Sequence, residues 1–172
     1  DPRLTWLLGM VDQLAAEKFL LICRSQAKVL ALEEVLRTRS GIKVARFHEG
    51  MSLLQRDRNA AYFADADGAR LLLCSEIGSE GRNFQFAHHL VLWDLPLDPD
   101  LLEQRIGRLD RIGQKHDIII HACASSGTAQ HALLRWYDIG LDAFRGSPSD
   151  GRELLKRYGE RLVALAEQHA HG

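Results

Sequence analysis

Residues 18–25, Lys18-Phe19-Leu20-Leu21-Ile22-Cys23-Arg24-Ser25, place five consecutive apolar side chains between two charged residues and end on a serine. A short unbroken apolar run is typical of a strand that is buried on both faces of a sheet. Ser25 can then cap a helix, which is predicted to extend to about Arg37. The side chains predicted to face inward from this helix are Leu30, Val35 and Leu36. A strand that leads directly into a helix is the repeating unit of a parallel α/β sheet.

The alternation of strands and helices continues on both sides of this stretch. A helix is predicted over residues 3–16, and further strands are predicted over residues 42–47, 70–74, 89–93 and 117–121. Helices are also predicted after Ser52, with Leu54, Ala61, Tyr62 and Phe63 facing inward, after Asp98, and from Thr128 to about Phe144. We therefore predict an α/β fold over residues 1–124, with a parallel β-sheet and helices on both faces. Residues 125–172 are predicted to form a C-terminal helical extension that packs on this domain.

The composition fits one soluble globular domain. The chain has 172 residues, of which 46% are hydrophobic and 26% charged, and its formal net charge is −1. This charge balance excludes a general electrostatic affinity for nucleic acid, so any contact with DNA must come from local patches. No apolar run approaches the length of a membrane span. Because the chain begins Asp1-Pro2, without a methionine or a basic signal region, we expect it to be a piece of a longer polypeptide.

The cysteines and histidines predict neither disulfide bonds nor a metal site. The three cysteines are widely separated and odd in number, which favours a reducing compartment. The histidines show no metal-binding pattern with a cysteine or carboxylate at helical spacing. One alternative is a thiol-dependent phosphatase or rhodanese-like domain, because Cys74 ends a predicted strand. Seven residues separate Cys74 from Arg82, however, which is a longer interval than such sites use.

The most specific stretch is residues 104–114, Gln-Arg-Ile-Gly-Arg-Leu-Asp-Arg-Ile-Gly-Gln, which follows the helix start at Asp98 and Pro99. The spacing predicts that Gln104, Arg108 and Arg111 share one helical face. Two neighbouring guanidiniums repel each other unless an anion lies between them, and their planar donors suit phosphate oxygens. The alternative is an ordinary surface helix. In that case the arginines are neutralised by Asp94, Asp100, Glu103 and Asp110.

This stretch resembles motif VI of the superfamily 2 helicases in the form found in Swi/Snf-type ATPases. Every fixed position of the family pattern Q-R-x-G-R-x-x-R-x-G-Q is present. The resemblance implies that the domain is a RecA-like helicase C-terminal lobe containing motifs IV to VI. It also implies that Arg108 and Arg111 are catalytic arginine fingers that reach the phosphates of ATP. Gln104 and Arg105 would help to order the same nucleotide cleft.

A second segment, residues 72–85, leaves a buried strand and enters a loop with glycines at positions 78 and 81. Such a loop can bring several backbone N–H groups toward an anion, although a plain structural turn is the alternative. The segment resembles motif V of the same ATPases. By that resemblance Ser75 and Gly78 face DNA. The residues implied near the nucleotide are Glu80, Gly81 and Asn83.

The chain departs from the usual family pattern inside motif V. Many Swi/Snf-type relatives have a second glycine and a leucine where this chain has Ser79 and Arg82. Arg82 is therefore either an additional phosphate contact or a surface charge.

Two further loops follow strands and resemble family elements that contact nucleic acid. Arg24 and Ser25 end the first predicted strand, as motif IV does, and His48 and Gly50 follow the second. Helix N-termini at Ser25 and Ser52 offer free N–H groups, which suit a phosphate backbone. Simple helix capping is the alternative at both positions.

The sequence contains neither a GxxxxGK[S/T] loop nor a D-E-x-H-type segment, so the resemblance implies the second of two motor lobes. ATP and Mg²⁺ would be held mainly by a first lobe of the same polypeptide, and this fragment would be inactive alone.

Residues 1–144 resemble the bacterial branch of the family that associates with RNA polymerase. This implies a DNA-dependent ATPase and translocase that acts on double-stranded DNA, remodels or recycles RNA polymerase during transcription, and is cytoplasmic and nucleoid-associated. A non-catalytic α/β interaction domain is the alternative function.

Overall fold

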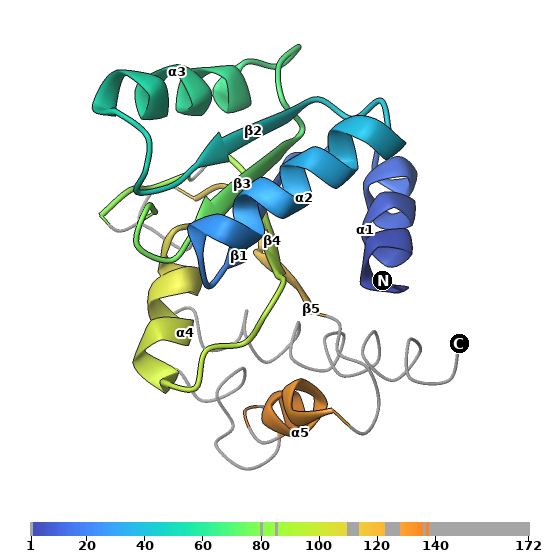
Figure 1. Ribbon diagram of the computed structural model, residues 1–172, viewed down its shortest axis with the longest axis vertical. Helices are drawn as coiled ribbons and strands as arrows, with labels where there is room; N and C mark the ends of the chain where they lie inside the picture. The colour runs from blue at the N-terminus through green and yellow to red at the C-terminus, as the bar shows by residue number, and fades with distance from the viewer. Residues whose placement is uncertain are drawn as a thin grey trace.

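The computed structural model describes residues 2–79, 81–84, 86–109, 114–122, 128–135 and 137. Its strands form one parallel five-stranded sheet in the order β2-β3-β1-β4-β5 (Figure 1). The strands are β1 (Phe19–Cys23), β2 (Val44–Phe47), β3 (Leu71–Ser75), β4 (His89–Leu92) and β5 (Ile119–Ala122). The helices are α1 (Pro2–Gln13), α2 (Gln26–Arg39), α3 (Leu53–Ala64), α4 (Pro99–Gly107) and α5 (Ala129–Arg135). The predicted α/β class with a parallel sheet is confirmed.

The predicted first strand lies at the centre of the sheet. β1 pairs with β3 on one side, with Phe19 opposite Leu71, and with β4 on the other, with Phe19 opposite His89. Every residue of β1 and β3 is buried, as expected for strands that are covered on both faces. The unbroken apolar run is therefore explained by the position of the strand.

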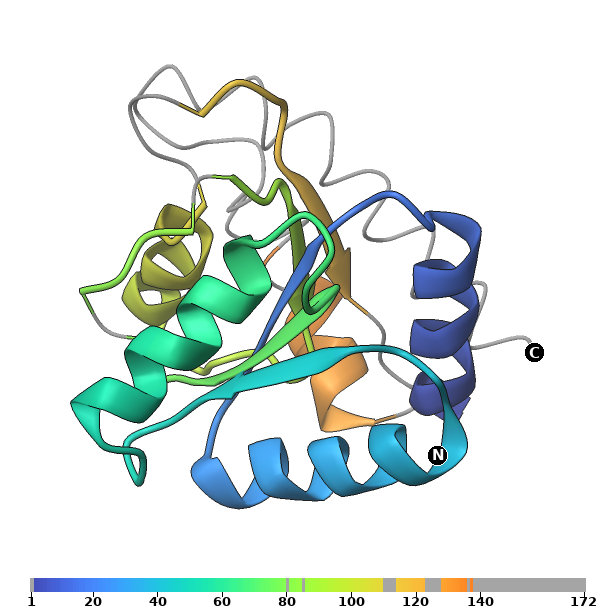
Figure 2. The same cartoon turned by 90° about the horizontal axis from the view of Figure 1, so that it is seen from above.

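Alternate residues of β1 belong to two separate hydrophobic cores. Phe19, Leu21 and Cys23 pack with α1 and α2, whereas Leu20 and Ile22 pack with α3, α4 and α5. Figure 2 shows α1 and α2 on one side of the sheet and α3 and α4 on the other. Since α2 follows β1 on one face and α4 follows β4 on the other, the loops after these adjacent strands diverge. In parallel α/β sheets such a divergence opens a crevice in which ligands bind.

The helix starts agree with the sequence. The Ser25 side chain accepts a hydrogen bond from the N–H of Lys28 (3.4 Å), and Ser52 forms a capping box with Gln55. Asp98 caps α4, with Pro99 in the first turn.

Four side chains predicted to face inward are instead exposed: Leu30 (40%), Tyr62 (41%), Leu54 (59%) and Ala61. On α2 the buried stripe is Val29, Leu32 and Leu36, and Leu30 lies about 100° around the helix from Val29. On α3 only Phe63 is buried among the described residues. These predictions were wrong because an apolar side chain at the border of a helix face reaches the core only where a neighbouring element covers it.

None of the helices within the described residues is long and apolar enough to cross a membrane. Of the helix predicted from Thr128 to Phe144, the structure describes α5. Residues 138–172 of the predicted helical extension, and the packing of that segment, lie outside the described residues.

Candidate functional site

The loops that carry the predicted motifs meet at the carboxyl edge of the sheet. Arg24, His48, Glu76 and Asp94 follow β1, β2, β3 and β4 directly or within two residues. Because all four strands are parallel, these residues lie along one edge of the sheet. They follow one another along that edge as the strands do, since β3 pairs with β2 and β1, and β1 pairs with β4. Three of them are connected by side chains to each other or to α4.

Arg105 is the centre of this connection. Its Nε donates to Glu76 Oε2 (2.6 Å) and its Nη2 donates to Glu76 Oε1 (2.9 Å), so the pairing is bidentate. Nη2 also donates to Asp94 Oδ1 (3.0 Å), and Nη1 donates to the Asp94 carbonyl. The guanidinium therefore joins α4 to the loops after β3 and β4.

We call Arg105, Glu76 and Asp94 the brace, and burial makes its stability sensitive to substitution of any of the three. The Arg105 side chain is only 2% exposed, and Glu76 and Asp94 are 20% and 9% exposed. Burial by itself lowers the pKa of Arg105, but the hydrogen bond and charge of Glu76 and the charge of Asp94 outweigh it and raise the pKa. Arg105 thus orders the edge from inside the protein and holds its charge at any physiological pH.

Asp94 extends the connection to the loop after β1. Its Oδ2 accepts the backbone N–H of Arg24 (3.0 Å), and Lys28 Nζ lies 3.9 Å from the same oxygen. The Asp94 carboxylate therefore spans the crevice between β1 and β4, while the Arg24 side chain remains exposed and Ser25 caps α2.

The arginine-rich stretch is less helical than predicted. α4 ends at Gly107 and Arg108 is its C-cap residue. Arg108 is 7% exposed, its carbonyl accepts the Phe84 N–H (2.8 Å), and Gln104 is exposed. Arg108 keeps helical backbone angles (φ −65°, ψ −27°) one turn after Gln104, although it is buried and Gln104 is exposed. The face shared with Arg111 stays a prediction. Arg111 lies outside the described residues, as does Glu80.

Four of the residues predicted to contact DNA meet in one cluster. The Gly50 N–H donates to His48 Nδ1 (3.1 Å), and the Gly78 N–H donates to Ser75 Oγ (3.0 Å). Ser75 in turn donates to Glu49 Oε2 (2.5 Å) and is fully buried, so its hydroxyl shapes the loop from inside. Burial, together with the charge of Arg46, lowers the pKa of His48.

Gly78 is the tightest point of this cluster. A Cβ at position 78 would lie 2.5 Å from His48 Cα and 2.7 Å from Ser75 Oγ, and backbone atoms of His48 cannot give way easily. We expect Gly78→Ala to lower the free energy of unfolding by about 1–3 kcal/mol through overpacking, as measured by urea denaturation.

Gly9→Ala is the matched control for this substitution, because nothing lies within 4 Å of its added Cβ in α1. That control is expected to be neutral or to stabilise the protein by about 0.5–1 kcal/mol. Equal effects of the two substitutions would contradict the close approach of the loops after β2 and β3.

Gly81, Arg82 and Asn83 of motif V are exposed or partly exposed. Gly81 has φ = +75°, a conformation suited to glycine, and Asn83 is exposed. Arg82 pairs with Asp57 Oδ1 on α3 (2.6 Å), and its guanidinium lies 5.2 Å from the centre of the Phe47 ring. Of the two interpretations of Arg82, the structure supports a surface charge that holds its loop against α3.

The thiol-dependent alternative is not supported. Cys74 is fully buried, and burial holds the pKa of its thiol well above the ordinary value. Burial likewise raises the pKa of Cys23 to about 12. Because the thiolate is the reactive form, neither cysteine is suited to nucleophilic catalysis.

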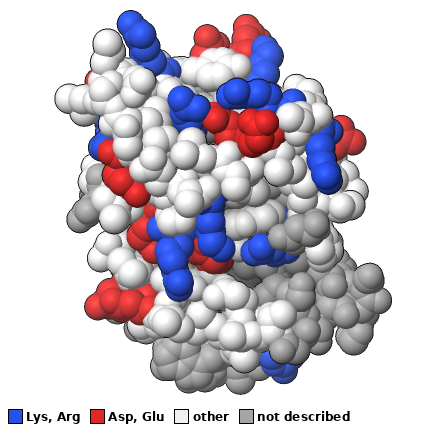
Figure 3. Space-filling view, in the orientation of Figure 1, with Lys and Arg blue, Asp and Glu red and all other residues white. Residues whose placement is uncertain are grey.

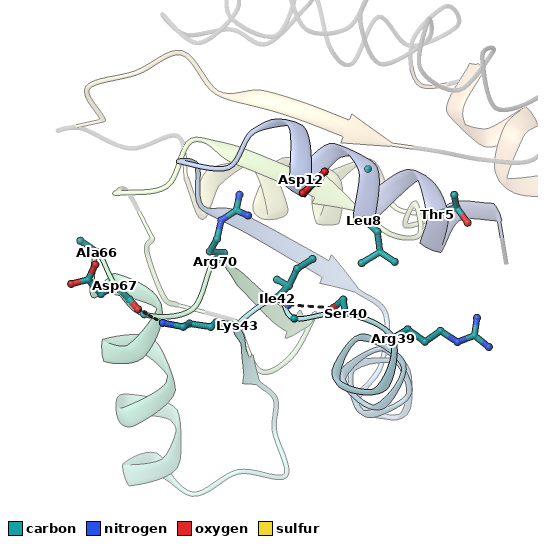
Figure 4. Close-up of a pocket in the computed structure, with 13 residues that line it drawn as sticks. Thr5, Leu8, Asp12, Arg39, Ser40, Ile42, Lys43, Ala66, Asp67 and Arg70 are labelled. Carbon is teal, nitrogen blue, oxygen red and sulfur yellow. Dashed lines mark hydrogen bonds between the residues drawn. The ribbon is translucent and has the colours of Figure 1, made fainter.

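The surface charges favour local contacts with nucleic acid over a general electrostatic attraction. Figure 3 shows lysine and arginine side chains interspersed with acidic ones on the face it displays. A hollow of about 890 Å³ lies at the opposite, amino-terminal edge of the sheet, between α1 and the segments that precede β2 and β3. Leu8 and Ile42 extend into it, and Lys43 Nζ donates to the Asp67 carbonyl (2.9 Å) at its rim (Figure 4). This hollow is separate from the predicted motifs.

Sequence reasoning missed three acidic residues that organise the carboxyl edge: Glu49, Glu76 and Asp94. Asp94 was considered only as a neutralising charge. Their position in the sequence could have identified two of them, because Glu76 and Asp94 both come within two residues of the end of a buried strand.

Comparisons with known proteins agree with this architecture. Residues 3–113 match the family described as helicase conserved C-terminal domain, and residues 117–172 match the RNA polymerase recycling family C-terminal. The chain is 60% identical over 169 residues to the RNA polymerase-associated protein RapA of Proteus mirabilis (strain HI4320), covering 98% of this chain. It is 58% identical over 164 residues to the same-named protein of Cronobacter sakazakii (strain ATCC BAA-894), covering 95% of this chain. It spans only 18% and 17% of the lengths of these relatives.

Two solved structures share the fold. The C-terminal part of the Fun30 ATPase domain superposes with a TM-score of 0.67 at 19% identity, covering 94% of this chain and 53% of that one. The E. coli DEAD-box protein SrmB, in a structure bound to regulator of ribonuclease activity A, superposes with a TM-score of 0.62 at 21% identity. That match covers 70% of this chain and 69% of the other. The RecA-like class predicted from the sequence is thereby confirmed.

Proposed function

The chain belongs to the helicase conserved C-terminal domain family, and from this we propose that it is the second motor lobe of a DNA-dependent Swi/Snf-type ATPase. The observation that carries the proposal is the brace of Arg105, Glu76 and Asp94. It fixes the end of α4, and with it Arg108, relative to three loops at the carboxyl edge. An arginine that must meet a phosphate held by another lobe requires such a rigid mount.

In the proposed mechanism, Arg108 and Arg111 stabilise the charge that develops on the transferred phosphoryl group. The nucleotide side of the edge is formed by Gln104, Arg105, Glu80, Gly81 and Asn83. Arg105 acts there as the brace and not as a direct contact. ATP supplies the phosphoryl group, and the guanidinium donors of this chain fit its phosphates. Mg²⁺ would be held mainly by the first lobe.

The proposed DNA track is the part of the edge formed by the loops after β1, β2 and β3. It comprises Arg24, Ser25, His48, Gly50, Ser75 and Gly78. Exposed Arg24 supplies charge, and the N–H groups at the start of α2 suit a phosphate of the backbone. Ser75 contributes by holding the N–H of Gly78 in place. Closure of the two lobes would then couple nucleotide state to movement along duplex DNA.

The longer polypeptide is proposed to act on RNA polymerase, to remodel or recycle it during transcription in the bacterial cytoplasm near the nucleoid. The support is that the similar proteins of Proteus and Cronobacter are named RNA polymerase-associated. The motor lobe is assigned to residues 1–124 and the helical extension to residues 125–172, with the lobe inactive when it is alone.

The experiment is ATP hydrolysis by the longer polypeptide, with and without duplex DNA, together with co-purification of RNA polymerase. We expect turnover that rises with DNA, and no turnover by the isolated 172-residue chain. A longer polypeptide that binds RNA polymerase but shows no DNA-stimulated hydrolysis would favour the non-catalytic interaction domain.

A further inference from the structure

Glu17, His88 and His89 bring three potential metal ligands together at the amino-terminal edge of the sheet, and we propose that they bind Zn²⁺ or a similar divalent transition-metal ion. Their ligand atoms all lie within 4.8 Å of one another. Glu17 Oε2 is 3.4 Å from His88 Nε2 and 3.8 Å from His89 Nε2. Two imidazoles with one carboxylate is a ligand set that zinc uses in proteins, with a fourth position left for water.

The observed spacing is close to what such an ion requires. Tetrahedral Zn²⁺ with bonds of about 2.0–2.2 Å holds neighbouring ligand atoms about 3.3–3.5 Å apart. The distance between Glu17 and His88 already has this value. The distance from Glu17 to His89 is 3.8 Å and that between the two histidine ligand atoms is at most 4.8 Å, so they need to shorten by up to about 1.5 Å, within reach of side-chain rotations. Coordination therefore needs no rearrangement of the sheet.

Neighbouring rings orient the ligands. His89 Nδ1 lies 3.0 Å from His121 Nε2, so that contact can hold the His89 proton on Nδ1 and leave Nε2 to face Glu17. The Phe19 ring packs on His89 with centroids 4.8 Å apart, and the His116 ring packs on His88 at the same distance.

The backbone on both sides of the site is also fixed. The Glu17 carbonyl accepts from Arg70 Nη2 (3.2 Å), and the His88 carbonyl accepts the Ile119 N–H (2.8 Å). A bound ion would join the turn between α1 and β1 to the start of β4, two segments far apart in the sequence.

This site does not depend on the proposed ATPase function, because it lies at the opposite edge of the sheet from the motifs. The proposal departs from the sequence-based expectation that the histidines form no metal site. That expectation considered helical spacing within one segment, whereas these ligands come from a turn and from the start of a strand.

Titration of the purified protein with Co²⁺, followed by visible absorption, tests the proposal. We expect one ion to bind, with an absorption spectrum typical of tetrahedral coordination, and Zn²⁺ to displace it and raise the Tm. His88→Ala and Glu17→Gln should each weaken Co²⁺ binding. Loss of a residue that only supports a ligand typically costs about 10–100-fold in metal affinity, and the loss of a ligand itself should cost more. Circular dichroism would verify that both variants are folded.

Two controls separate this site from other histidines. His131→Ala, on α5, and the double variant His169→Ala/His171→Ala, near the end of the chain, should bind Co²⁺ as the unchanged protein does. The proposal is overturned if Co²⁺ does not bind, or if its affinity is unchanged in His88→Ala and Glu17→Gln. It is equally overturned if binding is lost with His169 and His171.

Discussion

Replacing Arg111 with alanine in the longer polypeptide is expected to lower the rate of ATP hydrolysis by about 10³–10⁵-fold, the range found when an arginine finger is removed. The expectation rests on the proposed function, in which this guanidinium stabilises charge that develops only in the transition state. The loss should therefore appear in kcat, measured at saturating ATP and duplex DNA, with little change in DNA affinity. Arg108→Ala should act in the same direction.

Two variants show whether the guanidinium itself is needed. Arg111→Lys keeps the charge but not the planar pair of donors, so it should recover only a small part of the rate. Arg58→Ala removes an exposed charge from α3 and should leave kcat unchanged. For Arg108, which is 7% exposed and follows the end of α4, stability must be measured alongside activity. If kcat falls less than about tenfold in Arg111→Ala, Arg111 does not act as an arginine finger.

Arg105→Ala is expected to lower the free energy of unfolding by about 3–5 kcal/mol, because it leaves the carboxylates of Glu76 and Asp94 without their partner in a buried setting. The Arg105 side chain is 2% exposed, and those of Glu76 and Asp94 are 20% and 9% exposed, so water cannot replace the guanidinium fully. Since domains are stable by only about 5–15 kcal/mol, this loss is a large share of the total. Urea denaturation measures it directly.

The exposed neighbour Gln104 provides the control, and Gln104→Ala is expected to change stability by less than about 0.5 kcal/mol. Adding Glu76→Gln to Arg105→Ala should recover part of the lost free energy of unfolding, because a neutral amide replaces one of the two carboxylates that no longer pair with Arg105. If Arg105→Ala costs less than about 1 kcal/mol, or if Glu76→Gln makes the variant worse, the brace does not carry the energy assigned to it.

Much of the fold could be predicted because it depends on local patterns. The apolar run of β1 indicated a strand covered on both faces, and Ser25, Ser52 and Asp98 marked three helix starts correctly. The errors lay at the edges of helix faces, as at Leu30 and Tyr62, where burial depends on what packs beside the helix. The end of α4 at Gly107 was likewise not visible in the spacing of the arginines.

Local sequence patterns were enough to predict the parallel α/β class and to identify the family pattern of residues 104–114, because periodicity, caps and motifs all lie in short segments. The folded chain was needed to show that Arg105 pairs with Glu76, 29 residues away, and that Ser75 pairs with Glu49, 26 residues away. The same holds for the approach of Glu17 to His88 and His89. Such contacts form where the sheet brings the ends of separate strands together, so no local pattern in the chain can specify them.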